Sequence, residues 1–114
     1  MTEVPGVKVQ LFESIKNRGL IRGSLVQSLA GHDRRQAFLV IRVEGGFVWL
    51  ADGVNRSLGQ PKKKRVSHVR PLGQLPDPAA LDRIEALGDA GQRDAALRKL
   101  LHELIATNLT EEET

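Results

Sequence analysis

The sequence predicts a mainly β fold with an α-helical appendage: a small antiparallel barrel followed by a helical hairpin. Between residues 20 and 70, apolar residues alternate in short runs that glycine-containing turns separate, as in β-strands. After residue 76, apolar residues recur with the i, i+3, i+4 spacing of a helix face. The chain has 114 residues, which is enough for one domain with an appendage but not for two full domains.

Residues 1–19 form an N-terminal leader whose structure the sequence leaves open. Its apolar residues fit the two-residue period of a strand and the spacing of a helix about equally well. One expectation is a helix over residues 9–17 that ends before Gly19.

Residues 20–72 are expected to form the barrel. The predicted strands span residues 22–29, 37–43, 47–51 and 66–70, with a further short piece near 56–58. Gly45 and Gly46 tolerate the positive φ of a tight hairpin turn, and Asp52-Gly53 marks the next turn. Strands this short favour a barrel over an open sheet, because closure removes exposed edges.

Residues 73–76 are predicted to be a linker, since they are rich in proline and glycine. Residues 77–107 are then predicted to form the helical hairpin. Asp77 is the expected N-cap, Pro78 the first helical residue, and Gly88 the end of the first helix.

The second helix should have one continuous apolar stripe, made of Leu97, Leu100, Leu101, Leu104 and Ile105. On its polar side, Asp94 and Arg98 are four residues apart and are predicted to pair. The acidic residues 108–114 are expected to be a frayed tail.

Basic residues are concentrated in the first two thirds of the chain. Residues 1–76 contain 13 Lys and Arg against 5 Asp and Glu, a net charge of +8. Residues 77–114 contain 4 against 9, a net charge of −5. This asymmetry predicts that the first part of the chain faces a polyanion.

The composition excludes several other classes of protein. There is no cysteine, which excludes a disulfide framework, a cysteine-ligated zinc site and a cysteine nucleophile. No histidine pair has metal-ligand spacing, and no catalytic triad or glycine-rich phosphate loop is recognisable. We therefore expect no enzyme activity, no metal and no cofactor. No apolar run approaches about 20 residues and no secretory signal opens the chain, so we expect a cytoplasmic protein that does not bind membranes.

The strongest local feature is the run Pro61-Lys62-Lys63-Lys64-Arg65. Four consecutive cations cannot all be paired within this chain, so some must face solvent or a ligand. Because the loops of a small barrel gather at its two ends, we expect distant basic residues to merge into one patch. The predicted RNA contacts are His32, Arg34, Arg35, Arg42, Arg56, Lys62, Lys63, Lys64, Arg65 and Arg70.

Residues 19–72 also contain an ordered series of short motifs. These are Gly23-x-Leu25-Val26-x-Ser28-Leu29-Ala30-Gly31-His32-Asp33, Phe38-Leu39-Val40-Ile41, Asp52-Gly53-x-x-Arg56, Pro61-Lys62-Lys63-Lys64 and His68. The series resembles the KOW-domain RNA-binding proteins, and it is most similar to the large-subunit ribosomal proteins of the fourteen-e type and their small bacterial relatives.

This resemblance implies an SH3-like barrel that binds structured RNA, usually ribosomal, within a ribonucleoprotein that serves translation. The contacts it implies are Arg34, Arg56, Lys62, Lys63 and Lys64. Members commonly have glycine after the basic residue that follows the aspartate, whereas this chain has Arg35 there. We therefore expect this turn to bind by charge more than by close backbone approach.

Two alternatives stay open at this stage. Phe47 and Trp49 lie on one side of the third predicted strand, and we favour their being covered by the barrel or by the helical stripe over their being a base-stacking platform. The whole chain could also be a protein-interaction adaptor, which would use the barrel and the C-terminal helices to bind a protein partner.

Overall fold

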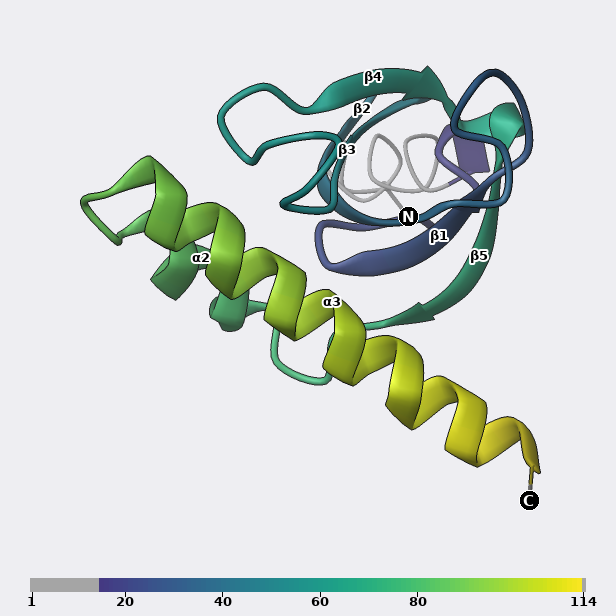
Figure 1. Ribbon diagram of the computed structural model, residues 1–114. Coiled ribbons are helices and arrows are strands. Elements are labelled where there is room, and N and C mark those ends of the chain that lie inside the picture. Colours follow the sequence, from purple (N-terminus) through teal and green to yellow (C-terminus); the bar gives the residue numbers. More distant parts are fainter. Residues whose placement is uncertain (1–14, 114) are drawn as a thin grey trace, which may run out of the picture.

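The computed structural model describes residues 15–113, with side chains up to residue 108, as a curved sheet crossed on one side by two helices (Figure 1). The strands are β1 (Ser24–Ser28), β2 (Ala37–Glu44), β3 (Phe47–Ala51), β4 (Lys62–Arg65) and β5 (Val69–Gln74). A 3-10 turn, η1 (Val66–His68), joins β4 to β5, and the helices are α2 (Ala79–Glu85) and α3 (Ala90–Glu113). The predicted leader lies mostly outside the described residues, although Ile15 and Lys16 are helical.

All strand pairs in the sheet are antiparallel, in the order β4-β3-β2-β1-β5. β4 and β5 are the two edges, and no ladder joins them within the described residues. The predicted combination of an antiparallel sheet and C-terminal helices is therefore confirmed, whereas closure of the sheet into a barrel is not observed.

The sheet curls around an inner core, which consists of Leu20, Val26, Phe38, Val40, Val48, Leu50, Val66 and Val69. Phe38 and Val40 of β2 face this core because side chains alternate along a strand. The register of β2 against β3 shifts between Val40 and Arg42, so Val43 rather than Arg42 packs on the inner core. This bulge directs Arg42 to the outside of the sheet.

A second core lies between the other face of the sheet and the two helices. Leu97, Leu101 and Leu104 of α3 are buried there against Leu25 and Leu39. The predicted stripe on α3 is thus confirmed, and it packs on the sheet of its own chain. Within the described residues, no helix is both long enough and apolar enough to cross a membrane.

Polar contacts also fix the helices against the rest of the chain. The guanidinium of Arg22 donates a hydrogen bond to the Ile41 carbonyl (2.9 Å) and forms ion pairs with Asp82 (2.9 Å) and Glu85 (2.8 Å) on α2. The Asp94 carboxylate of α3 accepts a hydrogen bond from the Leu58 backbone N–H (2.8 Å). The predicted Asp94–Arg98 ion pair does not form, and the Asp94 carboxylate binds this loop instead.

Several predicted boundaries are wrong. Residues 73 and 74 belong to β5 and Leu75 is buried in the core between sheet and helices, so residues 73–76 are not a linker. Residues 56–58 form no strand; they belong to the loop that follows Asp52. α3 extends beyond the predicted end of the hairpin at residue 107 and reaches Glu113.

The most consequential correction concerns the basic run. Residues 62–65 were expected in a loop before a last strand at 66–70, but they form β4, and the last strand begins at Val69. The four cations are therefore directed alternately to the two faces of the sheet.

Candidate nucleic-acid interface

A buried ion-pair network holds the turn that connects β1 to β2, which we call the motif turn (residues 29–36). Lys64 on β4 is 7% exposed, and its ammonium donates hydrogen bonds to Asp33 Oδ1 (2.7 Å) and to the Ala30 carbonyl (2.9 Å). Lys62, two residues earlier on the same face, pairs with Asp33 Oδ2 (2.9 Å). The Ser28 hydroxyl donates to Asp33 Oδ1 (2.7 Å) and accepts from Lys64 (2.5 Å).

The Asp33 carboxylate is charged at any ordinary pH. Burial by itself would raise the pKa of Asp33, but hydrogen bonds from Lys64, Lys62 and Ser28 outweigh burial and hold this pKa well below its ordinary value. Both oxygens of the carboxylate are satisfied inside the chain. This network is therefore a structural anchor for the motif turn, not a ligand site.

The anchored turn presents three basic side chains to solvent: His32, Arg34 and Arg35 are all exposed. Arg35 has a φ of 75°, in the left-handed region that favours glycine, and its N–H donates to the Ser28 carbonyl (2.8 Å). The backbone at position 35 thus adopts a glycine-like conformation while the residue supplies an additional cation.

The loop after β3 places Arg56 beside the motif turn. Asp52 Oδ1 accepts hydrogen bonds from the N–H groups of Val54 and Arg56 (both 2.9 Å), which confirms that Asp52-Gly53 forms a turn. Asn55 of this loop donates to Gln36 of the motif turn (3.3 Å). A shallow hollow of about 220 Å³ lies between the two loops, and His32, Arg56 and Lys62 line it with Asp33, Gln36, Phe38 and Asn55.

A second group of cations lies on the outer side of the sheet, where it covers two aromatic rings. We call this surface the outer aromatic face; it consists of Arg42, Phe47, Trp49, Lys63 and Arg65. The Arg42 guanidinium lies 4.6 Å from the centre of the Trp49 ring. The Lys63 ammonium lies 4.4 Å from the centre of the Phe47 ring and 5.4 Å from that of Trp49, and Arg65 is 6.0 Å from Phe47.

The expectation that Phe47 and Trp49 are covered by the barrel or the helices is therefore wrong. Both rings are half-buried, but neither belongs to the inner core or to the core under the helices. They are covered by cationic side chains from the neighbouring strands, because the register places Trp49 between Arg42 and Lys63 and places Phe47 beside Arg65.

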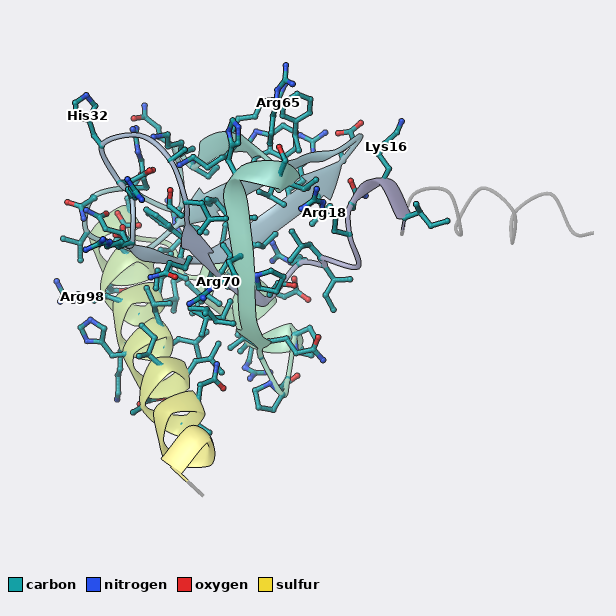
Figure 2. All side chains as sticks on the ribbon, turned by 90° about the vertical axis from the view of Figure 1, so that its right-hand side faces the viewer. Lys16, Arg18, His32, Arg65, Arg70 and Arg98 are labelled. Carbon is teal, nitrogen blue, oxygen red and sulfur yellow. The ribbon has the colours of Figure 1, made fainter. Side chains whose placement is uncertain are left out.

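The predicted contacts thus fall into two exposed groups and a remainder. The motif-turn end gathers His32, Arg34, Arg35 and Arg56, and the outer aromatic face gathers Arg42, Lys63 and Arg65. Figure 2 shows His32 and Arg65 at one end of the molecule, whereas Arg70 lies on β5 away from both. Lys62 borders the motif-turn group but is paired with Asp33. Lys64 is buried, so its prediction as an RNA contact is wrong: solvation of a free ammonium is replaced by a complete set of internal partners.

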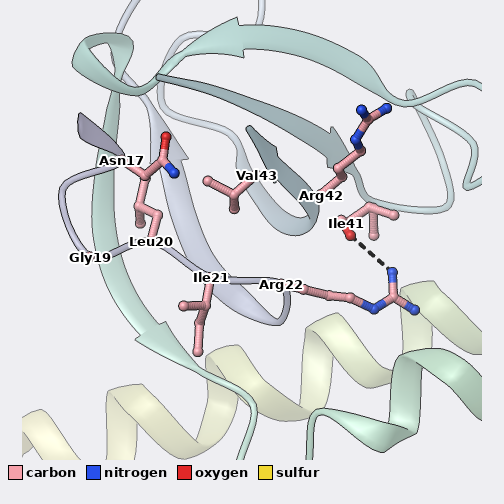
Figure 3. Close-up of a pocket in the computed structure, with 8 residues that line it drawn as sticks. All are labelled: Asn17, Gly19, Leu20, Ile21, Arg22, Ile41, Arg42 and Val43. Carbon is pink, nitrogen blue, oxygen red and sulfur yellow. Dashed lines mark hydrogen bonds between the residues drawn. The ribbon is translucent and has the colours of Figure 1, made fainter. Parts of the chain in front are cut away.

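Sequence reasoning missed two features beside these groups. Lys16 and Arg18, which the prediction did not include, are exposed, and Lys16 reaches the hairpin glycine Gly46 that precedes Phe47. An apolar groove of about 440 Å³ lies next to Arg42; its walls include Leu20, Ile21, Ile41 and Val43 (Figure 3). No local pattern signals this groove, because its walls come from the segment before β1 and from β2.

No protein-family model matches this chain, and no curated protein matches it. Within the described residues, no cluster of His, Asp and Glu side chains could hold a metal ion.

Proposed function

We propose that the chain is an RNA-binding module of the ribosome-associated kind, which binds structured RNA through the motif-turn end. The observation that carries this proposal is the anchoring of a highly basic turn. Asp33, Lys62 and Lys64 hold the backbone, while His32, Arg34 and Arg35 remain exposed, with Arg56 beside them. A rigid display of cations suits folded RNA, whose deep groove is closed to side chains and which is recognised by shape and phosphate position.

We further propose that the sheet is an SH3-like barrel of the KOW type. Its five antiparallel strands curl around a common core, and the 3-10 turn links the two edge strands. The position where the KOW-like pattern commonly has glycine adopts positive φ here, at Arg35. This conformation is what the resemblance leads one to expect at that position, and it supports the proposal although the residue differs.

The adaptor alternative has less support. It relied on the leucine stripe of the second helix as a surface for a protein partner, and Leu97, Leu101 and Leu104 of this stripe are buried against the chain's own sheet. We therefore keep RNA binding as the proposed function, with phosphate contacts at the motif-turn end and no chemical step.

The test is RNA binding by a charge variant and a matched control. The binding variant changes Arg34, Arg35 and Arg56 to Gln; the control changes Arg83, Arg98 and Lys99 on the helices to Gln, which removes the same charge from exposed positions. The equilibrium constant for an RNA hairpin is measured against salt concentration by fluorescence anisotropy. With roughly 4–6 phosphate contacts, the plot of log K against log salt should have a slope near −3 to −5.

The binding variant should reduce the magnitude of this slope by about 2, since each phosphate contact contributes about 0.7–0.9. The helix control should leave it nearly unchanged. Equal slopes in the binding variant and the wild type would remove the motif-turn end from the RNA surface. Crosslinking in cells, followed by sequencing of the attached RNA, would then identify the RNA and show whether it is ribosomal.

A further inference from the structure

The outer aromatic face differs in chemistry from the motif-turn end. The motif turn presents charge alone, whereas this face combines cations with two ring surfaces. Phe47 and Trp49 are half-buried on the outer side of β3, and Arg42, Lys63 and Arg65 lie above or beside the rings. A surface of this composition can bind a phosphate backbone and stack unpaired bases at the same time.

The cations of this face can bind an external anion. Within the described residues, Lys63 and Arg65 have no carboxylate partner. Arg42 pairs with Glu44 on its own strand, and both side chains of this pair are 61% exposed. An ion pair so exposed contributes little stability, so a phosphate can replace Glu44 at small cost.

The distance between the rings favours an extended strand as the ligand. Phe47 and Trp49 are two residues apart on β3, which separates their positions by about 7 Å at the usual rise of a strand. Successive phosphates of one strand in a duplex advance only about 3.4 Å along the axis. Two successive bases of one strand that each stack on one of these rings must therefore be unstacked from each other, as in a single strand.

We propose that the outer aromatic face binds a single-stranded segment of RNA. Its bases replace the cationic side chains over the Trp49 and Phe47 rings, and its phosphates contact the displaced Arg42, Lys63 and Arg65. The proposal rests on the proposed function and deepens it. The motif-turn end binds the folded part of the RNA, and the outer aromatic face binds unpaired nucleotides that adjoin it. Recognition by stacking tolerates any base, so little sequence preference is expected at this face.

The single tryptophan of the chain gives this proposal a direct readout. Titration of the full chain with an unstructured RNA of twelve uridines should quench the fluorescence of Trp49 to a saturable limit, because a stacked base contacts the ring. A fluorescein-labelled copy of the same RNA gives the affinity by anisotropy. Trp49→Leu together with Phe47→Leu should weaken binding at least about tenfold, because neither leucine offers a ring on which a base can stack.

Trp49→Phe is the matched variant, since it keeps an aromatic ring at the same position of β3. Its affinity for the uridine RNA should stay within about threefold of the wild type. If the cations only shield the rings from water, titration leaves Trp49 fluorescence unchanged, and the leucine variant binds the uridine RNA as the wild type does. Either result overturns the proposal.

The same two RNAs separate this proposal from the proposed function. Hairpin binding without quenching by the uridine RNA overturns only the single-strand site. Quenching by the uridine RNA without hairpin binding overturns only the function proposed for the motif-turn end. Absence of binding to both RNAs overturns both proposals.

Discussion

Lys63 and Lys64 are neighbours on β4, yet the two lysines have opposite surroundings. Lys64 is buried and holds Asp33, Ser28 and the Ala30 carbonyl, whereas Lys63 is exposed and lies against Phe47 and Trp49. Side chains alternate between the two faces of a strand. Every second cation of the run therefore holds the motif turn, and the others lie on the outer aromatic face. Net charge therefore overstates how many cations are available to a ligand.

The largest change in stability should appear when Lys64 and Lys63 are each replaced separately by glutamine. Lys64→Gln leaves a buried carboxylate with one fewer cation, and we expect the free energy of unfolding to fall by about 3–5 kcal/mol. Lys63→Gln is the matched control; it loses only exposed cation–π contacts, so we expect a fall of about 0.5–1 kcal/mol. Urea unfolding of the three proteins measures both values. Similar losses in the two variants would contradict the division of β4 into two faces.

Acid should weaken the ion-pair network of Asp33, Lys62 and Lys64 and leave the outer aromatic face unaffected. The folded-state pKa of Asp33 lies below its unfolded value, so the stability that Asp33 contributes is complete above about pH 4 and is lost as pH falls further. This residue should add up to about 1.4 kcal/mol per pH unit to the acid slope of the unfolding free energy.

The measurement is urea unfolding between pH 5 and about pH 2, in the wild type and in Asp33→Asn. The variant lacks this carboxylate, so its stability should depend less steeply on pH than that of the wild type. The exposed Asp77 provides the comparison variant Asp77→Asn. A hydrogen bond from Arg83 also holds the pKa of Asp77 below its usual value, but this pair lies in solvent, so the acid slope of Asp77→Asn should differ less from that of the wild type than the slope of Asp33→Asn does. Parallel curves for the wild type and Asp33→Asn would mean that Asp33 titrates normally.

A smaller effect on stability, an increase in the free energy of unfolding, should follow from a substitution in the motif turn. Arg35 has a positive φ, which costs roughly 1–2 kcal/mol for a residue with a side chain, whereas glycine costs about 0.5–1 kcal/mol in lost chain entropy. Arg35→Gly should therefore raise the free energy of unfolding by up to about 1 kcal/mol while it weakens hairpin binding through the lost charge. Arg34→Gly, at a position without positive φ, should lower stability instead. A loss of stability in Arg35→Gly would show that the arginine side chain holds the turn.

The parts of the fold that depend on local pattern could be predicted from sequence. β3 matches its predicted bounds, and the leucine stripe of α3 is buried as its spacing indicates. β4 could not be predicted, because Lys62–Arg65 has no apolar residue to mark an inner face. Its inner lysines are stabilised by Asp33, a partner about 30 residues away in sequence, and such a pairing leaves no local signal.

The candidate site, too, could be predicted only where its residues are close together in the sequence. The basic residues of the motif turn were found because they lie in one short segment. The coverage of Trp49 by Arg42 and Lys63 depends on the register of three strands and on the bulge in β2, which residue spacing does not specify. The expectation that all four cations of the basic run join one patch did not allow for the alternation along β4, which directs Lys62 and Lys64 to the face opposite Lys63 and Arg65.

Gly53 lies where the loop after β3, in the basic part of the chain, contacts α3, in the acidic part. It has a φ of 80°, and a side chain there would collide with the backbone carbonyl of Asp94 on α3, so the loop that bears Arg56 rests directly on the helix. The Asp94 carboxylate secures the far end of that loop at Leu58. The acidic helix thereby fixes the position of the loop that bears Arg56, so the proposed RNA-binding surface depends on both parts of the chain.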